Sequence, residues 1–316
     1  MHLSTFGDLR SLLHGAHTLE VQNERWDELL AILEAAHKAT PEEVEEQWLP
    51  YVLVQLDTWE DEARMAPRSW VHMLLRQKSP GVLMALVRAV DVERIGNPKF
   101  KRMCEHDGFQ WVTHLSFGGH KIRLDSIQEL AESEVFTNLT SLVFHDTNLG
   151  SVKLHALSRA PFIENLKSLR LPSCELGSNE LEVLFKKFAL GELRQLDLRD
   201  NPLDDNGAVA MCNADLPALR HLTLSSQTPL EVIERCLAPS EWSAQLERLT
   251  LILYQNRGRM KPEDIGSRSA VRRWLREHSG VFAKRMIPPY KELLEQCFRT
   301  SSIREEVWRE TLENLG

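Results

Sequence analysis

Cysteine is scarce in this chain, and the few cysteines form no pattern. Five cysteines among 316 residues lie far apart, and no two of them are separated by only two residues. This spacing argues against a disulfide framework and against a zinc site built from paired cysteines. No apolar run reaches the 18 or so residues of a transmembrane helix, and no cationic and apolar leader begins the sequence. We therefore expect a soluble, cytoplasmic protein without a membrane partner.

The short motifs of common enzyme classes are missing as well. The sequence has no glycine-rich phosphate loop, no GxSxG nucleophile elbow and no HExxH zinc helix. Cys297 begins Cys-Phe-Arg and not the Cys-x-Asp motif of one class of bacterial ubiquitin ligases. We therefore predict that the protein is not an enzyme, with no catalytic residue, no metal site and no cofactor.

One phrase recurs through the middle of the chain at a near-constant interval. It consists of an apolar residue, two variable residues, an apolar residue, a variable residue and a final apolar residue. The six copies begin 26 or 27 positions apart, at Val112, Leu139, Leu166, Leu193, Leu219 and Leu246. A constant period of this length is typical of a solenoid, in which stacked repeats form a curved binding surface.

Each repeat combines a short strand with a helix-like segment. In LRQLDLRDNPL the leucines at 193, 196 and 198 alternate as in a strand, and Asn201 follows three places after Leu198. A small polar side chain there can bond backbone groups exposed where the chain turns inward. Helix-like segments follow at 126–133, 153–160, 179–188, 207–213 and 229–237. This alternation predicts an α/β solenoid of about six repeats with parallel strands and outer helices.

The repeats resemble a known family. SRAPFIENLKSLRLPSCELG at 158–177 and FTNLTSLVFHDTNLG at 136–150 are similar to bacterial leucine-rich repeat proteins of the ribonuclease-inhibitor-like class, whose pattern is LxxLxLxxN/CxL followed by a helix. Cys174 stands at the Asn/Cys position, which implies a structural role. The pattern is broken at Pro229 and at Ile252-Leu253. The resemblance implies a non-catalytic protein that binds other proteins through its concave face.

Helical regions are expected on both sides of the repeats. We predict a helical amino-terminal cap over 1–106, the solenoid over 107–256 and a helical carboxy-terminal cap over 257–316. In the first cap, Thr40-Pro41 followed by Glu43 predicts a helix start with a capping box, and Pro50 predicts the end or a kink of that helix. The segment GVLMALVRAV at 81–90 is interpreted as a further helix.

The variable strand positions predict the residues of the concave face. The candidate partner-binding residues are His145, Arg170, Asp197, Arg199, Asp200, His221 and Arg248. The charges at mid-sheet either recognise a partner or simply pair with one another as a solvated surface. His114, His145 and His221 lie on different predicted strands, and the first and last are too far apart to share a metal ion.

Charge is distributed unevenly along the chain, although the net charge is −8. Residues 23–64 carry twelve acidic side chains against three basic ones, and residues 255–291 carry ten basic against three acidic. The sequence thus favours a protein-binding scaffold, with an inhibitor or immunity-type regulator implied by the resemblance. The alternative is a nucleic-acid-associated protein that uses the basic segment 257–291. Contact between acidic and basic ends would also allow head-to-tail self-association.

Overall fold

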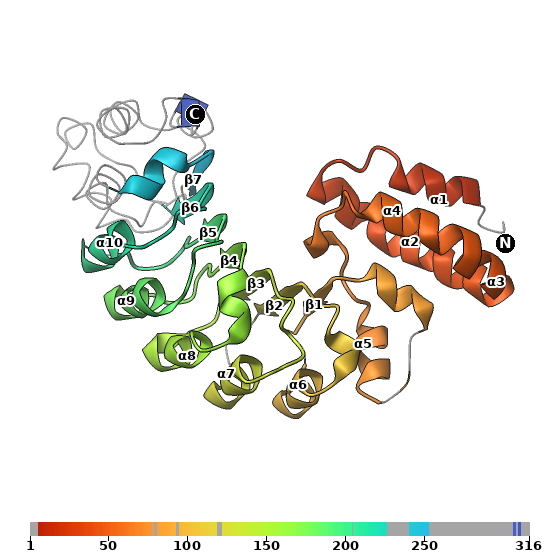
Figure 1. The fold of residues 1–316 in the computed structure, drawn as a ribbon, viewed down its shortest axis with the longest axis horizontal. Coiled ribbons are helices and arrows are strands. Elements are labelled where there is room, and N and C mark those ends of the chain that lie inside the picture. Colours follow the sequence, from red (N-terminus) through yellow and green to blue (C-terminus); the bar gives the residue numbers. More distant parts are fainter. Residues whose placement is uncertain are drawn as a thin grey trace, which may run out of the picture. The chain divides into compact units, whose positions relative to one another are not determined.

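The computed structural model describes residues 6–76, 78, 81–92, 95–118, 122–203, 205–225, 240–252, 306–307 and 309–310. The protein has an α/β fold whose seven described strands form one open parallel sheet, in the sequence order β1 to β7 (Figure 1). The chain divides into two compact units. The first contains Met1–Ser116 and Glu134–Leu139, and the second contains Phe117–Ser133 and Thr140–Gly316.

The first unit is mainly helical. Its helices are α1 (Phe6–Leu13), α2 (Leu19–Ala39), α3 (Pro41–Glu43), α4 (Leu49–Leu56), α5 (Arg68–Leu74) and α6 (Asn97–Cys104). Helix α2 begins after Thr18, whose hydroxyl oxygen accepts a hydrogen bond from the Val21 amide at 3.4 Å. One face of α2 is apolar and lies in the core, since Trp26, Leu29 and Leu33 are buried. Helix α1 packs on both α2 and α4.

Two details of the predicted helix start after Thr40 are wrong. The Thr40 hydroxyl donates back to the carbonyl of Ala36 at 3.4 Å and does not cap the next helix, and the Glu43 carboxylate accepts from the Trp48 indole at 3.1 Å. Pro50 does not end the helix. A π-helical turn over Val44–Trp48 precedes α4, and Pro50 lies in the first turn of α4, where its missing N–H costs least.

The helix predicted over 81–90 is also wrong. A 3₁₀ turn occupies Val82–Leu86, and the strand β1 occupies Ala89–Asp91. The strand pairs in parallel with the first residues of β2 (His114–Gly118), so that Ala89 lies opposite His114. Ala89 and Val90 are fully buried. Pairing with a distant strand has therefore overridden the local helical spacing of the apolar residues.

The second unit alternates strands with helices. Its strands are β3 (Ser141–His145), β4 (Ser168–Arg170), β5 (Gln195–Asp197), β6 (His221–Ser225) and β7 (Arg248–Ile252), and its helices are α7 (Leu124–Ala131), α8 (Gly150–Leu157), α9 (Ser178–Lys187) and α10 (Asp205–Cys212). Each strand from β2 to β7 begins two residues after the first residue of a recurring phrase. The predicted parallel strands are therefore confirmed, and the arrangement is compatible with a repeat solenoid.

The register of the sheet follows the sequence period. Ser141, Ser168, Gln195, His221 and Arg248 lie opposite one another on successive strands. In this unit the first leucine of each phrase and the leucine at the second position of each strand are buried in the core. A slip by one residue would expose these leucines, so their burial fixes the register.

The predicted role of Asn201 is confirmed. The side chain is fully buried, and its oxygen accepts from the amides of Cys174 and Leu176, both at 3.0 Å. Its amide group donates to the carbonyls of Leu171 at 2.7 Å, Leu198 at 3.0 Å and Arg199 at 3.1 Å. One side chain thus bonds backbone groups of two successive turns.

The other polar turn positions act more locally. The Thr147 hydroxyl donates to the His145 carbonyl at 2.9 Å. The Cys174 thiol is fully buried and donates to the Phe144 carbonyl at 3.2 Å. Burial raises the pKa of this thiol to about 12, so that it stays protonated and unreactive at neutral pH. This agrees with the structural role implied for Cys174.

Some of the sequence predictions concern residues outside the described ranges. The helix-like segment 229–237 lies outside the described residues, and so does the carboxy-terminal cap 257–316 except for Glu306, Val307, Arg309 and Glu310. Within the part of the chain that the structure describes, no helix combines the length and apolar character needed to cross a membrane.

Candidate functional site

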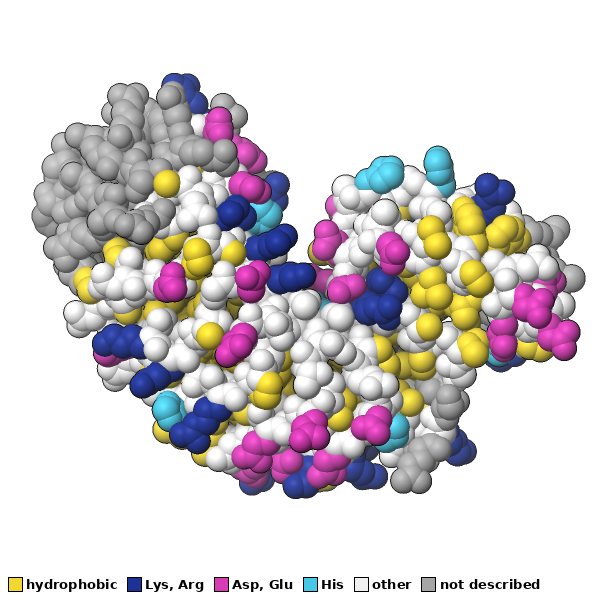
Figure 2. Space-filling model, viewed as in Figure 1, with side chains coloured by type: hydrophobic (Ala, Val, Ile, Leu, Met, Phe, Trp, Pro, Cys, Tyr) yellow, Lys and Arg dark blue, Asp and Glu magenta, His cyan; other side chains and the backbone are white. Residues whose placement is uncertain are grey.

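The candidate residues lie on the inner side of the strands of the second unit, here called the strand face. Helices α7 to α10 lie on the other, outer side of β3 to β7, so the described helices of this unit leave its inner side open (Figure 1). Lys and Arg side chains gather beside β4 to β7, with histidine and acidic side chains next to them (Figure 2). Parallel sheets normally bury both faces under helices, so a polar face of this kind calls for a functional explanation.

An Arg–Asp pair lies at the centre of this face. The guanidinium Nη2 of Arg199 is 2.9 Å from Oδ2 of Asp197, and the Arg199 amide donates to Oδ1 of the same carboxylate at 3.1 Å. Asp197 is only 3 % exposed, whereas the Arg199 side chain is 37 % exposed. Asp197 therefore positions Arg199, and Arg199 is the member of the pair that a partner can reach.

Opposing influences act on the pKa of Asp197. Burial raises the pKa of its carboxyl group above the ordinary value, and the nearby charge of Asp200 acts in the same direction. The hydrogen bond from the Arg199 amide and the charges of Arg199 and Arg170 oppose this shift. Arg170 lies directly opposite Asp197 in the register of β4 and β5. The predicted mid-sheet cluster is thus brought together, with the carboxylate of Asp197 at its centre.

A second group of charges lies on β6 and β7. His221 faces Arg248 across the strand pair, and Nε2 of His221 is 3.9 Å from Oε2 of Glu247. The pKa of His221 is lowered, first by burial and then by the positive charge of Arg248, and Glu247 opposes the shift. His221 is therefore mainly neutral at pH 7. Glu247 is not among the residues predicted from the sequence, although Glu247 directly precedes Arg248 in the sixth phrase.

Three equivalent turn residues follow the strands in an unusual backbone conformation. Asp146, Ser173 and Asp200 have φ angles of 50°, 54° and 59°, in the left-handed region that non-glycine residues rarely adopt. Asp146 lies next to His145, with 3.3 Å between its Oδ2 and the histidine Nδ1. The repeated geometry fixes where Asp146 and Asp200 leave the ends of β3 and β5. His145 lies three strands from His221, roughly 14 Å at the usual strand spacing.

The three histidines that lie on the strands do not lie together. His114 is 2 % exposed and lies on β2, whereas His145 and His221 are on β3 and β6. Among the described residues no group of three or more His, Cys, Asp or Glu side chains is arranged to hold a metal ion.

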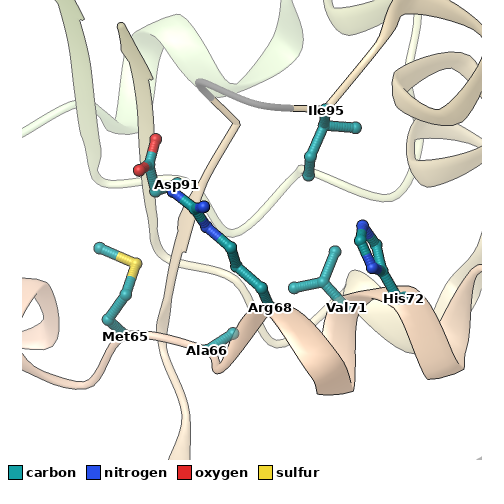
Figure 3. A pocket seen from close by; sticks show the side chains of 7 residues that line it. All are labelled: Met65, Ala66, Arg68, Val71, His72, Asp91 and Ile95. Carbon is teal, nitrogen blue, oxygen red and sulfur yellow. The ribbon is translucent and has the colours of Figure 1, made fainter.

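The first unit contains a separate cavity that the sequence analysis did not predict. It has a volume of about 330 Å³, and its described lining is Met65, Ala66, Arg68, Val71, His72, Asp91 and Ile95. Arg68 and His72 rise one helical turn apart from α5, Arg68 extends toward Asp91 on β1, and Ile95 points in from the opposite side (Figure 3). These residues come from three separate segments, so no spacing in the sequence could have indicated the cavity.

The cavity is less well built for recognition than the strand face. Arg68 and His72 are exposed, and the buried part of the described lining is apolar. No described lining residue is a serine or a cysteine, the usual nucleophiles of covalent catalysis. By contrast, Arg199 makes two contacts to a buried carboxylate, one from its guanidinium and one from its backbone amide. The strand face therefore carries the functional argument.

Two sequence predictions about the basic segment concern parts outside the described residues. The nucleic-acid alternative depends on 257–291, and head-to-tail association depends on the same segment meeting 23–64. No protein-family model matches the chain, and no curated protein matches it.

Proposed function

We propose that the second unit is a leucine-rich repeat solenoid of the ribonuclease-inhibitor-like class and that it binds a protein partner through its strand face without catalysing a reaction. The observation that carries the proposal is the Arg199–Asp197 pair, in which a buried carboxylate holds a reachable guanidinium. Arginine is enriched among the residues that dominate binding energy. A side chain that is already fixed loses less conformational entropy on binding.

The contact residues in this proposal are six of the seven predicted ones. Arg199 and Arg170 form the centre, Asp200 and His145 lie toward the strand ends, and His221 and Arg248 extend the face to β6 and β7. Asp197 is assigned a positioning role because its side chain is buried. This division means that Asp197 contributes through Arg199 and not by direct contact.

Within this class, an inhibitor or immunity-type regulator of a cognate enzyme is our more specific proposal. It rests on the resemblance of the repeats to the ribonuclease-inhibitor-like class. Such a partner would be held through many charged contacts arranged for complementarity, which favours specificity and fast association. Its capture should therefore weaken as salt screens the charges.

Identification and mutation of the partner test the proposal. The full chain is used as bait in extract of its native cells, and captured proteins are identified and quantified by mass spectrometry. Arg199→Ala and Arg248→Ala should each lower capture of the partner by about tenfold. Arg159→Ala, which removes an exposed arginine just after α8, is the matched control and should capture as wild type. Equal capture by all three variants would refute binding through the strand face.

A further inference from the structure

A row of basic side chains runs along the amino-terminal ends of three successive strands. Lys167 precedes β4, Arg194 precedes β5 and Arg220 precedes β6. The amide of Arg194 donates to the carbonyl of Lys167, and the amide of Arg220 donates to that of Arg194, both at 2.8 Å. The three residues, here called the basic row, therefore occupy adjacent rungs of the sheet, about 4.8 Å apart.

Intramolecular pairing neutralises only one end of the basic row. Nε of Arg220 is 3.8 Å from Oε1 of Glu247, which occupies the next rung. Lys167 and Arg194 are exposed, and neither side chain makes a hydrogen bond or an ion pair within the described residues. Like charges on adjacent rungs repel one another, so this arrangement reduces stability slightly in the free protein. A ligand of opposite charge would remove that cost.

The basic row is continuous with the proposed binding face. Glu247 lies within 4 Å of both Arg220 and His221, so it links the end of the basic row to His221 on β6 and to Arg248 on β7. The row ends at Thr140 on one side, because the Lys167 amide donates to the Thr140 carbonyl, and at Glu247 on the other. Its basic part is thus three rungs long, and the outer two rungs lie roughly 9.6 Å apart.

The spacing of the row favours one backbone geometry for the ligand. On an α-helix, carboxylates at i, i+4 and i+7 share one face and span about 10.5 Å, close to the length of the row. On an extended segment, carboxylates at i, i+2 and i+4 span about 13.4 Å, about 4 Å more than the row. The helix therefore matches the three rungs more closely than the extended segment does.

Nucleic acid is the less favourable ligand for this row. The chain carries a net charge of −8, and Glu247 continues the row directly. A polyanionic backbone would bring further phosphates against the Glu247 carboxylate, whereas a helix can end its acidic stripe after three residues.

We infer that the basic row receives an acidic α-helix of the protein partner, whose carboxylates at i, i+4 and i+7 lie over Lys167, Arg194 and Arg220. This inference rests on the proposed function and specifies the chemistry of the partner. The contact forms by charge complementarity at the rim of the strand face. It steers the partner on association, and Arg199 and Arg170 form the centre of the contact.

The probe for this inference is a pair of isomeric helical peptides of about 20 residues. Both have the same composition and three glutamates, which stand at i, i+4 and i+7 in the aligned peptide and on three different faces in the dispersed peptide. Binding to the full chain is measured by fluorescence anisotropy at low and at physiological salt. The aligned peptide should bind about tenfold more tightly than the dispersed one.

Two variants with the same change of net charge complete the test. The double substitution Lys167→Glu with Arg194→Glu should abolish the preference for the aligned peptide. Lys186→Glu with Lys187→Glu, on the exposed side of α9, should retain it. Circular dichroism of all proteins checks that each is folded. Equal binding of the two peptides to wild type, or equal loss in both variants, would overturn the inference.

Further measurements distinguish an acidic helix from nucleic acid and separate failure of this inference from failure of the proposed function. A labelled DNA duplex that binds more tightly than the aligned peptide, and is released by the Lys167 and Arg194 substitutions, would overturn the helix in favour of nucleic acid. If Arg199→Ala and Arg248→Ala lose the native partner while the peptides bind equally, only the basic row inference fails. If those variants capture normally while the peptide preference holds, the strand-face proposal fails instead.

Discussion

In the first unit, buried polar side chains join segments that have no counterpart elsewhere, whereas in the second unit Asn201 serves turns of repeated sequence. Gln22 donates to the Ala16 carbonyl and accepts from the Glu60 amide, both at 3.0 Å. The Trp26 indole donates to the Met65 carbonyl at 2.7 Å, across 39 residues of sequence. These bonds in the first unit join segments far apart in the sequence, whereas Asn201 in the second unit bonds two neighbouring turns at a position defined by the period.

Because of this difference, a substitution is expected to affect a larger part of the second unit than of the first. In the second unit a turn is shared by neighbouring repeats, so the loss of Asn201 affects two of them at once. In the first unit each bond ties one pair of segments, so its loss stays local. The two units are also expected to differ in cooperativity, because stacked repeats are stabilised mainly by their nearest neighbours.

The largest effect is expected for Asn201→Ala. The substitution leaves buried amides and carbonyls of two turns without partners, each of which costs about 1–3 kcal/mol in other proteins. We expect the free energy of unfolding to fall by about 3 kcal/mol, measured by urea denaturation. Asn165→Ala, at an exposed position in the same unit, should change it by less than about 0.5 kcal/mol. A loss equal to that of the control would show that the turns are satisfied in another way.

A smaller and more local effect is expected for Gln22→Leu. The Ala16 carbonyl and the Glu60 amide lose their partner, which should lower the free energy of unfolding by about 2 kcal/mol. Hydrogen exchange should show the loss of protection in the first unit, whereas Asn201→Ala should show it in the second. Asn23→Ala, exposed on the same helix, serves as the control. Identical exchange patterns for the two variants would break the distinction between the units.

A pH effect is expected at the centre of the strand face. The pKa of Asp197 is raised in the folded state, so the folded protein holds a proton that the unfolded chain releases in the window just above the ordinary value. The contribution of Asp197 to the free energy of unfolding therefore falls as pH rises through that window and stays low at neutral pH.

Asp197→Asn should remove this dependence and change stability at pH 7 by less than about 1 kcal/mol. It should nevertheless weaken partner capture, because Arg199 loses the carboxylate that holds it. Urea denaturation between pH 3 and pH 7, compared with wild type, measures the first effect. Capture that stays at the wild-type level would contradict the positioning role.

The smallest effect is expected for Arg248→Ala. The positive charge of Arg248 lowers the pKa of His221, after burial, so its removal should raise that pKa toward the ordinary value. The first unit has no described counterpart of this histidine–arginine pair across strands. Titration of the His221 ring by nuclear magnetic resonance measures the change. An unchanged or lower pKa would show that burial alone sets it.

The sequence predicted the second unit better than the first for a physical reason. The strands, their parallel order and the bonding of Asn201 follow from residues that recur at one interval, because repeated residues place repeated backbone groups in register. The helix predicted at 81–90 failed because β1 forms only against a strand more than 20 residues away. The segment VRAVDV at 87–92 also fits the recurring phrase, 25 positions before Val112, so the period carried a signal for β1 that the helical interpretation missed.

The candidate site was predicted in part for the same reason. Alternation along a strand indicates which side chains share a face, and it placed Arg170, Asp197 and Arg199 together. Alternation does not indicate how deeply each side chain is buried. The burial of Asp197 and the exposure of Arg199 depend on the packing of the turn between them, and the involvement of Glu247 depends on the distance between two strands.

The sequence by itself determined that this protein contains parallel strands at a period of 27 residues, with leucines inside and polar residues on one face. A period constrains the backbone because hydrogen-bonded neighbours must occupy equivalent positions. Only the tertiary structure decided which of the polar residues hold their neighbours and which remain available. That division depends on burial and on distances of a few ångströms between side chains from different strands, and the order of residues along the chain does not specify them.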